Sequence, residues 1–320
     1  MRRRTLFILL ALTAAALFAA DVCTGTVRLS LTQVFDALSG SADDQTRTIV
    51  IDIRLVKAVV ALLAGMALSV SGLQMQTLFH NPLAGPYVLG LSSGASLGVA
   101  LLLLGGAAGT FGIAGAAMVG AAAVMLLLLV VNERIRDIMT LLILGIMFSS
   151  AIGAVVQILQ YLSREHALKS YVVWTMGSLG EVTGPQLGVL GACVAAGLLL
   201  TLFTVKPLNL IMLGDSYAQS AGVNLRRSRF MLLASTTLLA GSVTAFCGPI
   251  GFIGMAVPHI ARWLFRSADH AVMMPASALI GAAMLIACDI VSRRFMIPIN
   301  AVTSLAGIPV VICVVLRKND

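Results

Sequence analysis

Long apolar stretches, separated by short polar or charged segments, recur along most of this 320-residue chain. Hydrophobic residues make up 59% of the sequence and charged residues only 11%, whereas a water-soluble domain has about 25% charged residues. A compact soluble fold has too little interior to hide this much apolar surface, so the surrounding solvent must be lipid. The composition therefore predicts an integral membrane protein in which residues 1–320 form a single transmembrane domain.

Ten of these stretches have the length of membrane-spanning helices, because about 20 residues cross the hydrocarbon core. Leu, Ala, Val and Gly dominate them, without the alternation of polar and apolar residues that is typical of outer-membrane β-strands. We therefore expect an all-α bundle. The expected spans are residues 5–22, 56–76, 87–104, 111–131, 138–161, 186–206, 229–247, 250–265, 271–289 and 298–316.

The basic residues predict the orientation, since Lys and Arg are more frequent in cytoplasmic loops. With the N-terminus inside, most of them fall on the cytoplasmic side and both termini are cytoplasmic. This favours a first membrane helix over a cleaved signal peptide for the apolar run that follows the first three arginines. The cytoplasmic set is Arg2, Arg3, Arg4, Arg134, Arg136, Lys206, Arg226, Arg227, Arg229, Arg262, Arg266, Arg317 and Lys318, and the outer set is Arg28, Arg47, Arg54, Lys57, Arg164, Lys169, Arg293 and Arg294.

Three loops and two rows of small residues are distinctive. We expect outer polar loops at residues 23–53 and 162–185, and a cytoplasmic loop at 207–228 that is long enough to dock a soluble partner. The rows of small residues have the spacing that lets helix backbones approach closely in lipid, so helix packing accounts for them. They are Gly90, Gly94 and Gly98 in one row, and Gly145, Ser149 and Gly153 in the other.

The sequence lacks the motifs of several kinds of chemistry. No G-x-x-x-x-G-K-[ST] loop is present to bind the phosphates of ATP. Five cysteines occur singly, without the spacing of metal ligands. We therefore expect no catalytic residue, no metal and no cofactor. The net charge of +8 is explained by cytoplasmic loops, so it does not indicate nucleic acid as a partner.

Ion-coupled carriers usually need ionisable groups deep in the membrane. Of the thirteen acids we expect only Asp289 near a span, at its outer end, and His80, His259 and His270 at cytoplasmic ends. A secondary transporter is therefore disfavoured. A passive channel stays open, although no span carries the polar stripe that would line a narrow ion filter.

Several segments resemble the FecCD-type permease family, which supplies the membrane subunits of ABC importers for iron-siderophores, haem and cobalamin. The first segment contains the patterns S-G-x-x-x-Q, N-P-L-A-x-P and L-G-x-S-x-G-A of that family, and the second contains P-H-x-x-R. The matching segments are Ile53–Leu97, Gly248–Arg262, 213–224, 288–293 and 297–315.

The resemblance implies a permease in the inner membrane of a prokaryote that works by alternating access. Its implied partners are a second permease chain, with a homodimer expected, two ABC ATPase subunits that hydrolyse ATP, and an extracytoplasmic substrate-binding protein. Membrane lipid surrounds the assembly. An iron-siderophore is the expected substrate, because it is the most populous class in the family, and cobalamin and haem stay open.

The resemblance also assigns roles to residues. It implies that Arg54, Lys57 and Arg293 are outer cations that meet carboxylates of the binding protein, although Val56 and Lys57 replace a usual proline and arginine. Met296 and Asn300 are further departures at the outer mouth. The residues implied to couple to the ATPase are Leu213, Gly214, Asp215, Tyr217, Ala218, Gly222 and Val223. The positions implied at the pathway or at helix breaks are Gly90, Ser92, Ser93, Gly248, Pro249, Gly251, Gly254 and Pro258.

Overall fold

The computed structural model describes residues 2–25, 27, 29–105, 112–134 and 137–317, and all regular structure in these ranges is helical. The expected all-α fold is thereby confirmed. Arg28, Arg136 and Lys318, which belong to the basic sets above, lie outside the described residues. The elements are α1 (Arg2–Cys23), α2 (Leu31–Ser39), α3 (Asp44–Arg47), the π-helix η1 (Thr48–Leu55), α4 (Val56–Leu78), α5 (Leu91–Leu103), α6 (Ile113–Arg134), α7 (Ile138–Leu162), α8 (Glu165–Thr175), α9 (Gly184–Ile211), α10 (Asp215–Ser220), α11 (Leu225–Thr236), the π-helix η2 (Thr237–Gly241), α12 (Ser242–Cys247), α13 (Ile253–Phe265), α14 (His270–Phe295) and α15 (Ile299–Arg317).

Polar residues beside the apolar runs set where several helices begin. The Asp137 carboxylate accepts hydrogen bonds from the backbone N–H groups of Met139 and Thr140, and Asp269 accepts one from the N–H of Ala271. These bonds satisfy N–H groups that have no partner within the helix. The pKa of the Asp137 carboxyl is lowered from its ordinary value, and the main cause is the hydrogen bond that it accepts from the Thr140 hydroxyl. The starts of α7 and α14 are therefore encoded by local side chains.

Each of the ten expected spans coincides with a helical segment, and α11, η2 and α12 together form one of them. Seven helices in the described residues are long and apolar enough to cross a membrane. Two others, α5 and α13, have only 13 residues each. At about 1.5 Å per residue such a helix is about 20 Å long, which is less than the hydrocarbon thickness of about 30 Å. The chain is a multi-pass membrane protein in which these two helices cover part of the depth.

The two short helices differ from the sequence expectation at their starts. The expected spans 87–104 and 250–265 begin in the structure at Leu91 and Ile253, because the chain is not helical over residues 79–90 and 248–252. The expected outer loops differ as well. Residues 23–53 contain α2, α3 and most of η1, and residues 162–185 contain α8, so both segments are largely helical.

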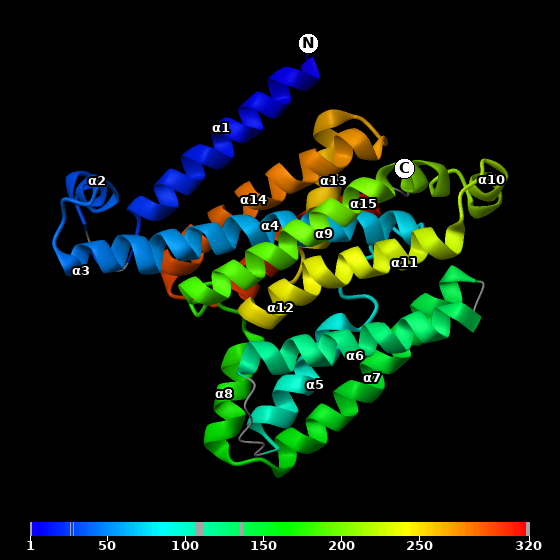
Figure 1. Ribbon diagram of the computed structural model, residues 1–320, viewed down its shortest axis with the longest axis horizontal. Coiled ribbons are helices and arrows are strands. Elements are labelled where there is room, and N and C mark those ends of the chain that lie inside the picture. Colours follow the sequence, from blue (N-terminus) through cyan, green and yellow to red (C-terminus); the bar gives the residue numbers. More distant parts are fainter. Residues whose placement is uncertain (1, 26, 28, 106–111, 135–136, 318–320) are drawn as a thin grey trace.

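Helix α4 lies in the middle of the bundle, beside α14, α13 and α9 (Figure 1). Two pairs of glycines bring its backbone against its neighbours: a Cβ atom on Gly65 would overlap the carbonyl group of Gly281, and one on Gly72 would overlap that of Gly254. Gly94 of α5 faces Gly120 of α6 in the same way, as expected from the row of small residues. Close backbone packing of this kind is how helices associate in lipid.

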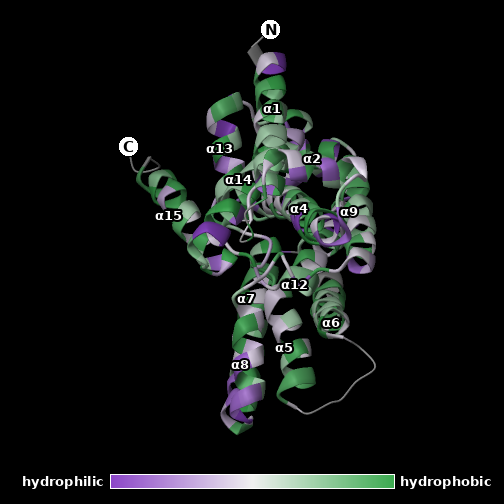
Figure 2. Cartoon of the chain, turned by 90° about the vertical axis from the view of Figure 1, so that its left-hand side faces the viewer, coloured by the Kyte–Doolittle hydropathy of each residue, from purple (hydrophilic) through white to green (hydrophobic). Residues whose placement is uncertain are grey.

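The two ends of the bundle carry different elements. Helix α10 lies at one end of the long axis and α2 and α3 lie at the other, and α1 begins away from α2 and runs towards it (Figure 1). This direction of α1 agrees with an N-terminus on the side of the membrane opposite α2. Large apolar side chains are exposed between the ends, for example Leu12 and Leu202, which are 61% and 66% exposed. Figure 2 shows that hydrophobic residues dominate the long helices of the bundle, as contact with lipid requires.

Candidate functional site

The two non-helical segments lie against each other inside the bundle. The Tyr87 hydroxyl accepts a hydrogen bond from Thr244 Oγ1 at 3.2 Å and one from the N–H of Ile250 at 3.5 Å. A Cβ atom on Gly254 would lie 2.6 Å from Cδ of Pro86. The segments enclose a cavity of about 230 Å³, lined by Gly85, Pro86, Tyr87, Val88, Ile250, Gly251, Phe252, Gly254 and Met255. Non-helical backbone at membrane depth occurs where it is buried in protein or faces a cavity, and both conditions are met at this place.

Helix α15 holds the second break at two points. The side-chain oxygen of Asn300 accepts a hydrogen bond of 2.9 Å from the N–H of Gly251. Phe252 has a φ of 65°, in the left-handed region that a bulky residue rarely adopts. Its Cβ lies so close to Gly307 of α15 that a side chain at that glycine would meet it at 2.5 Å. Backbone strain of this kind persists where the surroundings fix it, and here α15 supplies those surroundings.

Asn300→Ala is expected to loosen the second break, because the N–H of Gly251 loses its acceptor at a cost of about 1–2 kcal/mol. Hydrogen exchange followed by mass spectrometry should show faster exchange over residues 248–252. Ser304→Ala is the matched control, since the Ser304 hydroxyl donates to the Asn300 carbonyl within α15. Unchanged exchange in Asn300→Ala would contradict the assignment.

The residues expected at the pathway gather around these breaks. Gly90 has a φ of 80° and precedes α5, whose first turn contains the half-buried Ser92 and Ser93. Gly248, Pro249 and Gly251 form the second break. Gly254 and Pro258 are buried in α13, and Gly254 packs against α4. Contact with a solute remains a prediction for all eight positions.

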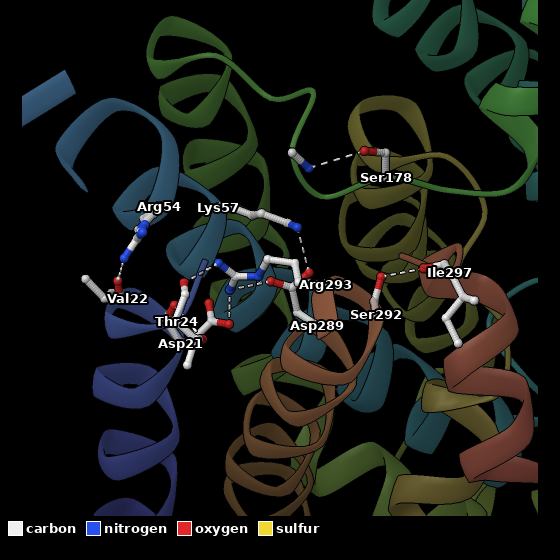
Figure 3. A network of polar contacts seen from close by, with 11 residues as sticks. Asp21, Val22, Thr24, Arg54, Lys57, Ser178, Asp289, Ser292, Arg293 and Ile297 are labelled. Atoms are coloured by element: carbon white, nitrogen blue, oxygen red, sulfur yellow. Dashed lines mark hydrogen bonds and ion pairs between the residues drawn. The ribbon is translucent and has the colours of Figure 1, made fainter. Parts of the chain in front are cut away.

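A cluster of five charged residues joins α1, η1, α4 and α14 at the outer end (Figure 3). Asp289 pairs with Lys57 at 3.0 Å and with Arg293 at 2.7 Å, and Arg293 also pairs with Asp21. The fifth charged residue is Arg54, whose guanidinium donates to two backbone carbonyls in the last turn of α1 and to one in the segment after it. These carbonyls belong to Val22, Cys23 and Val27, with the shortest bond, 2.6 Å, to Val27.

This outer charge cluster corrects two expectations. Arg54 was expected to be an exposed cation, but its side chain is only 3% exposed, and Lys57 and Arg293 already have carboxylate partners within the chain. Asp289 is not the only acid near a span, because Asp21 is fully buried in α1. An acid inside an apolar run is itself a signal of a buried partner, and the sequence around Asp21 contained that signal.

At the cytoplasmic end, polar side chains from two of the quoted motifs meet. Arg262 donates to the side-chain oxygen of Gln76 at 2.7 Å, and the Gln76 amide donates to the Met255 carbonyl at 2.9 Å. His259 bonds to the carbonyl of Pro82 at 2.7 Å, and His270 to the hydroxyl of Thr77 at 2.8 Å. The end of α4, the turn after it, helix α13 and the start of α14 are therefore fixed to one another.

A second buried polar group lies deeper and was not expected from the sequence. Gln74 of α4 donates to Thr201 Oγ1 of α9 at 3.0 Å and accepts from Ser235 and Thr236 of α11 at 3.2 Å each. Interhelical hydrogen bonds of this kind contribute to association of helices in lipid. The three helices are thereby joined at one level of the bundle.

The cytoplasmic loop contains the short helix α10. Gly214 precedes it with a φ of 113° and Gly222 follows it with a φ of 86°. Asp215 begins the helix and pairs with Arg229 at 2.7 Å, which holds α10 against α11. The remaining coupling candidates divide by exposure: Leu213 and Tyr217 are 62% and 53% exposed, Ala218 is buried and Val223 packs against the core. Leu213, which precedes the helix, and Tyr217 within it are therefore large side chains that are open to the surroundings.

Several known membrane permeases are similar to this chain in sequence or in fold. The chain is 34% identical to HmuU, the hemin transport system permease of Yersinia pestis, over 98% of this chain and 95% of that protein. It is 36% identical to BtuC, a vitamin B12 import system permease of Escherichia coli, over 83% of each. A solved structure described as an inward-facing metal-chelate type ABC transporter superposes with a TM-score of 0.88 at 26% identity, over 98% of this chain and 99% of that one.

The family model for the FecCD transport family matches residues 10–317. This range contains both helix breaks, the outer charge cluster and α10. The resemblance drawn from the sequence motifs is confirmed, and the chain belongs to the FecCD transport family.

Proposed function

We propose that this chain is the permease subunit of an ATP-driven importer that carries an iron chelate of the siderophore type by alternating access. The observation that carries the proposal is the pairing of an exposed helix, α10, at the cytoplasmic end with two broken helices inside the bundle. Helix α10 suits docking of an ATPase partner. The two helix breaks supply segments that can shift without unfolding a span. The chain contains no phosphate-binding motif, so ATP hydrolysis belongs to separate subunits.

Two observations support the proposed class of substrate: the names of the relatives and the residues that line the cavity at the helix breaks. The hemin and vitamin B12 permeases among the relatives, and the metal-chelate transporter among the structures, all carry large ring or chelate compounds by their names. The cavity at the breaks has mainly apolar and glycine walls, which suit a bulky chelate better than a bare ion. Haem is the second candidate, because the hemin permease matches 98% of this chain.

We further propose a homodimer with two ATPase subunits on the α10 side and a binding protein on the outer side, in the inner membrane of a prokaryote. Three cations in the outer charge cluster face two carboxylates, so the cluster keeps a positive charge. Arg54, Lys57 and Arg293 all line an outer cavity of about 280 Å³. Carboxylates of a binding protein would be attracted to that charge, which sets encounter rate and orientation more than affinity.

Uptake into vesicles tests the proposal directly. The permease is reconstituted with its cognate ATPase, loaded with ATP, and supplied with the binding protein and a ferric hydroxamate, haem or cobalamin. Uptake of the ferric hydroxamate that stops when ATP is replaced by a non-hydrolysable analogue is the expected result. Uptake of haem or cobalamin alone would replace the substrate, and uptake that persists without hydrolysis and follows an ion gradient would refute the ATP-driven mechanism.

Asp215→Ala is expected to reduce ATP-driven uptake about tenfold while the permease stays folded. The variant removes a charge-assisted hydrogen bond, worth about 1.5–3 kcal/mol, that holds α10 against α11. Uptake rate and ATPase activity are measured together, and the uptake per ATP should fall. Ser216→Ala, at an exposed neighbour on the same helix, is the control. Equal loss in both variants would show that the Asp215–Arg229 pair has no special part in coupling.

A further inference from the structure

A cavity of about 520 Å³ opens at the cytoplasmic ends of α6 and α11, away from the helix breaks and from the outer charge cluster. Among the residues that the structure describes, its walls come from α6 and the start of α11. They are Leu126, Leu129 and Val130 of α6, with Asn224, Arg226, Arg227 and Phe230 at the start of α11. None of these residues has been assigned a part in transport above.

The walls change from charged to apolar with depth. Arg226 and Arg227 lie in the first turn of α11, and Phe230 follows about one turn further along. On the opposite wall, Leu126 lies eight residues before the end of α6 at Arg134, which corresponds to about 12 Å along the helix. The cavity therefore has a basic mouth at the level of the helix ends and an apolar wall that extends into the membrane.

The side chains around the cavity are open to the surroundings. Arg226 and Arg227 are exposed, and Leu126, Val130 and Phe230 are 62%, 61% and 53% exposed. Basic residues in the first turn of a helix oppose its dipole, which favours acids there. The two adjacent arginines therefore do not stabilise α11 through its dipole, and their charge at the mouth of the cavity is complementary to an anionic ligand.

We propose that this cavity binds one anionic phospholipid of the cytoplasmic leaflet. Its phosphate contacts Arg226 and Arg227, whose guanidinium groups suit phosphate oxygens, and an acyl chain lies along Leu126, Val130 and Phe230. Basic pockets between spans on the cytoplasmic side are suited to such headgroups. The apolar depth favours a lipid over a soluble partner, because a loop of a water-soluble protein would have to enter the hydrocarbon region without satisfying its backbone.

Native mass spectrometry of the delipidated full-length chain tests the proposal with phosphatidylglycerol as the probe. Phosphatidylcholine and glycerol phosphate are the comparison ligands, because the first lacks the net negative charge and the second lacks the acyl chains. We expect one phosphatidylglycerol to be retained at least tenfold better than either. Equal retention of phosphatidylcholine, or tight binding of glycerol phosphate alone, would overturn the assignment to an anionic lipid.

Two variants locate the site. Arg226→Gln with Arg227→Gln should lower phosphatidylglycerol retention at least fivefold, whereas Lys206→Gln with Arg266→Gln, which removes two exposed cations elsewhere at the same end, should leave it unchanged. Val130→Trp fills the apolar wall and keeps both arginines, and it should lower retention as well. The proposal is wrong if the first pair retains the lipid as the native chain does, or if the control pair loses it equally.

Discussion

Gly72→Val is expected to prevent recovery of a folded permease, with a loss of at least about 3 kcal/mol in the free energy of unfolding. A Cβ atom at this position would overlap the carbonyl group and Cα of Gly254, and both are backbone atoms. A side chain can rotate away from such a clash, but two helix backbones can only move apart. Separation of α4 from α13 would also break the contacts that Gln76 makes with Met255 and Arg262.

Size-exclusion chromatography and thermal unfolding in detergent measure this effect. Gly188→Val is the matched control, because a Cβ atom on Gly188 of α9 would have open space around it. Both variants carry the same change in helix propensity, so the difference between them isolates the packing of α4 on α13. A folded Gly72→Val protein with native thermal stability would show that these two helices do not pack as described.

Asp289→Ala has the second largest expected effect, a loss of about 3 kcal/mol. The carboxylate is 1% exposed and is shared by Lys57 and Arg293. Its removal leaves buried cations short of a partner, which typically costs about 3–5 kcal/mol. The lower end of that range applies because the two cations keep 18% and 14% exposure. Thermal and chemical unfolding in detergent give the measurement.

A double-mutant cycle separates the ion pair from the loss of a side chain. Lys57→Met combined with Asp289→Ala should cost less than the sum of the single changes, by about 0.5–3 kcal/mol. Asp36→Ala, at an exposed acid on α2 near the same end, should stay within about 0.5 kcal/mol of the native chain. Strict additivity of the two changes would mean that Lys57 and Asp289 do not interact in the folded protein.

The sequence allowed prediction of the spans but not of the places where they stop being helical. Apolar length predicts a span wherever it occurs, so residues 87–90 and 250–252 were included in helices. The helices are interrupted at these residues by tertiary contacts. Tyr87 bonds to the second break, and Asn300 of α15 supplies an acceptor for the N–H of Gly251. Neither partner is close in sequence. Only the glycines and prolines of residues 248–258 indicated a break there.

The outer charge cluster shows a different limit. Family resemblance assigned Arg54, Lys57 and Arg293 to docking from their positions beside spans, and that role is still a prediction. The same resemblance carried no information about what these side chains contact within the chain. Asp21 belongs to the first helix, which lies outside the quoted motifs. Asp21 and Arg293 are 272 positions apart, so no periodic pattern in a single sequence links them. The structure was needed to find this pair.

The long distance in sequence between Asp21 and Arg293 affects the order in which the helices pack during synthesis. Asp21 enters the membrane with the first helix, but its partner Arg293 follows 272 residues later. At about 5–20 residues per second, the ribosome needs roughly 15–50 s to reach it. Through that interval the acid is without its guanidinium, and its place near the outer end of α1 leaves the interfacial water within reach. The contact between α1 and α14 can therefore form only after α14 has been synthesised, whereas the bonds from Arg54 to the end of α1 are available much earlier.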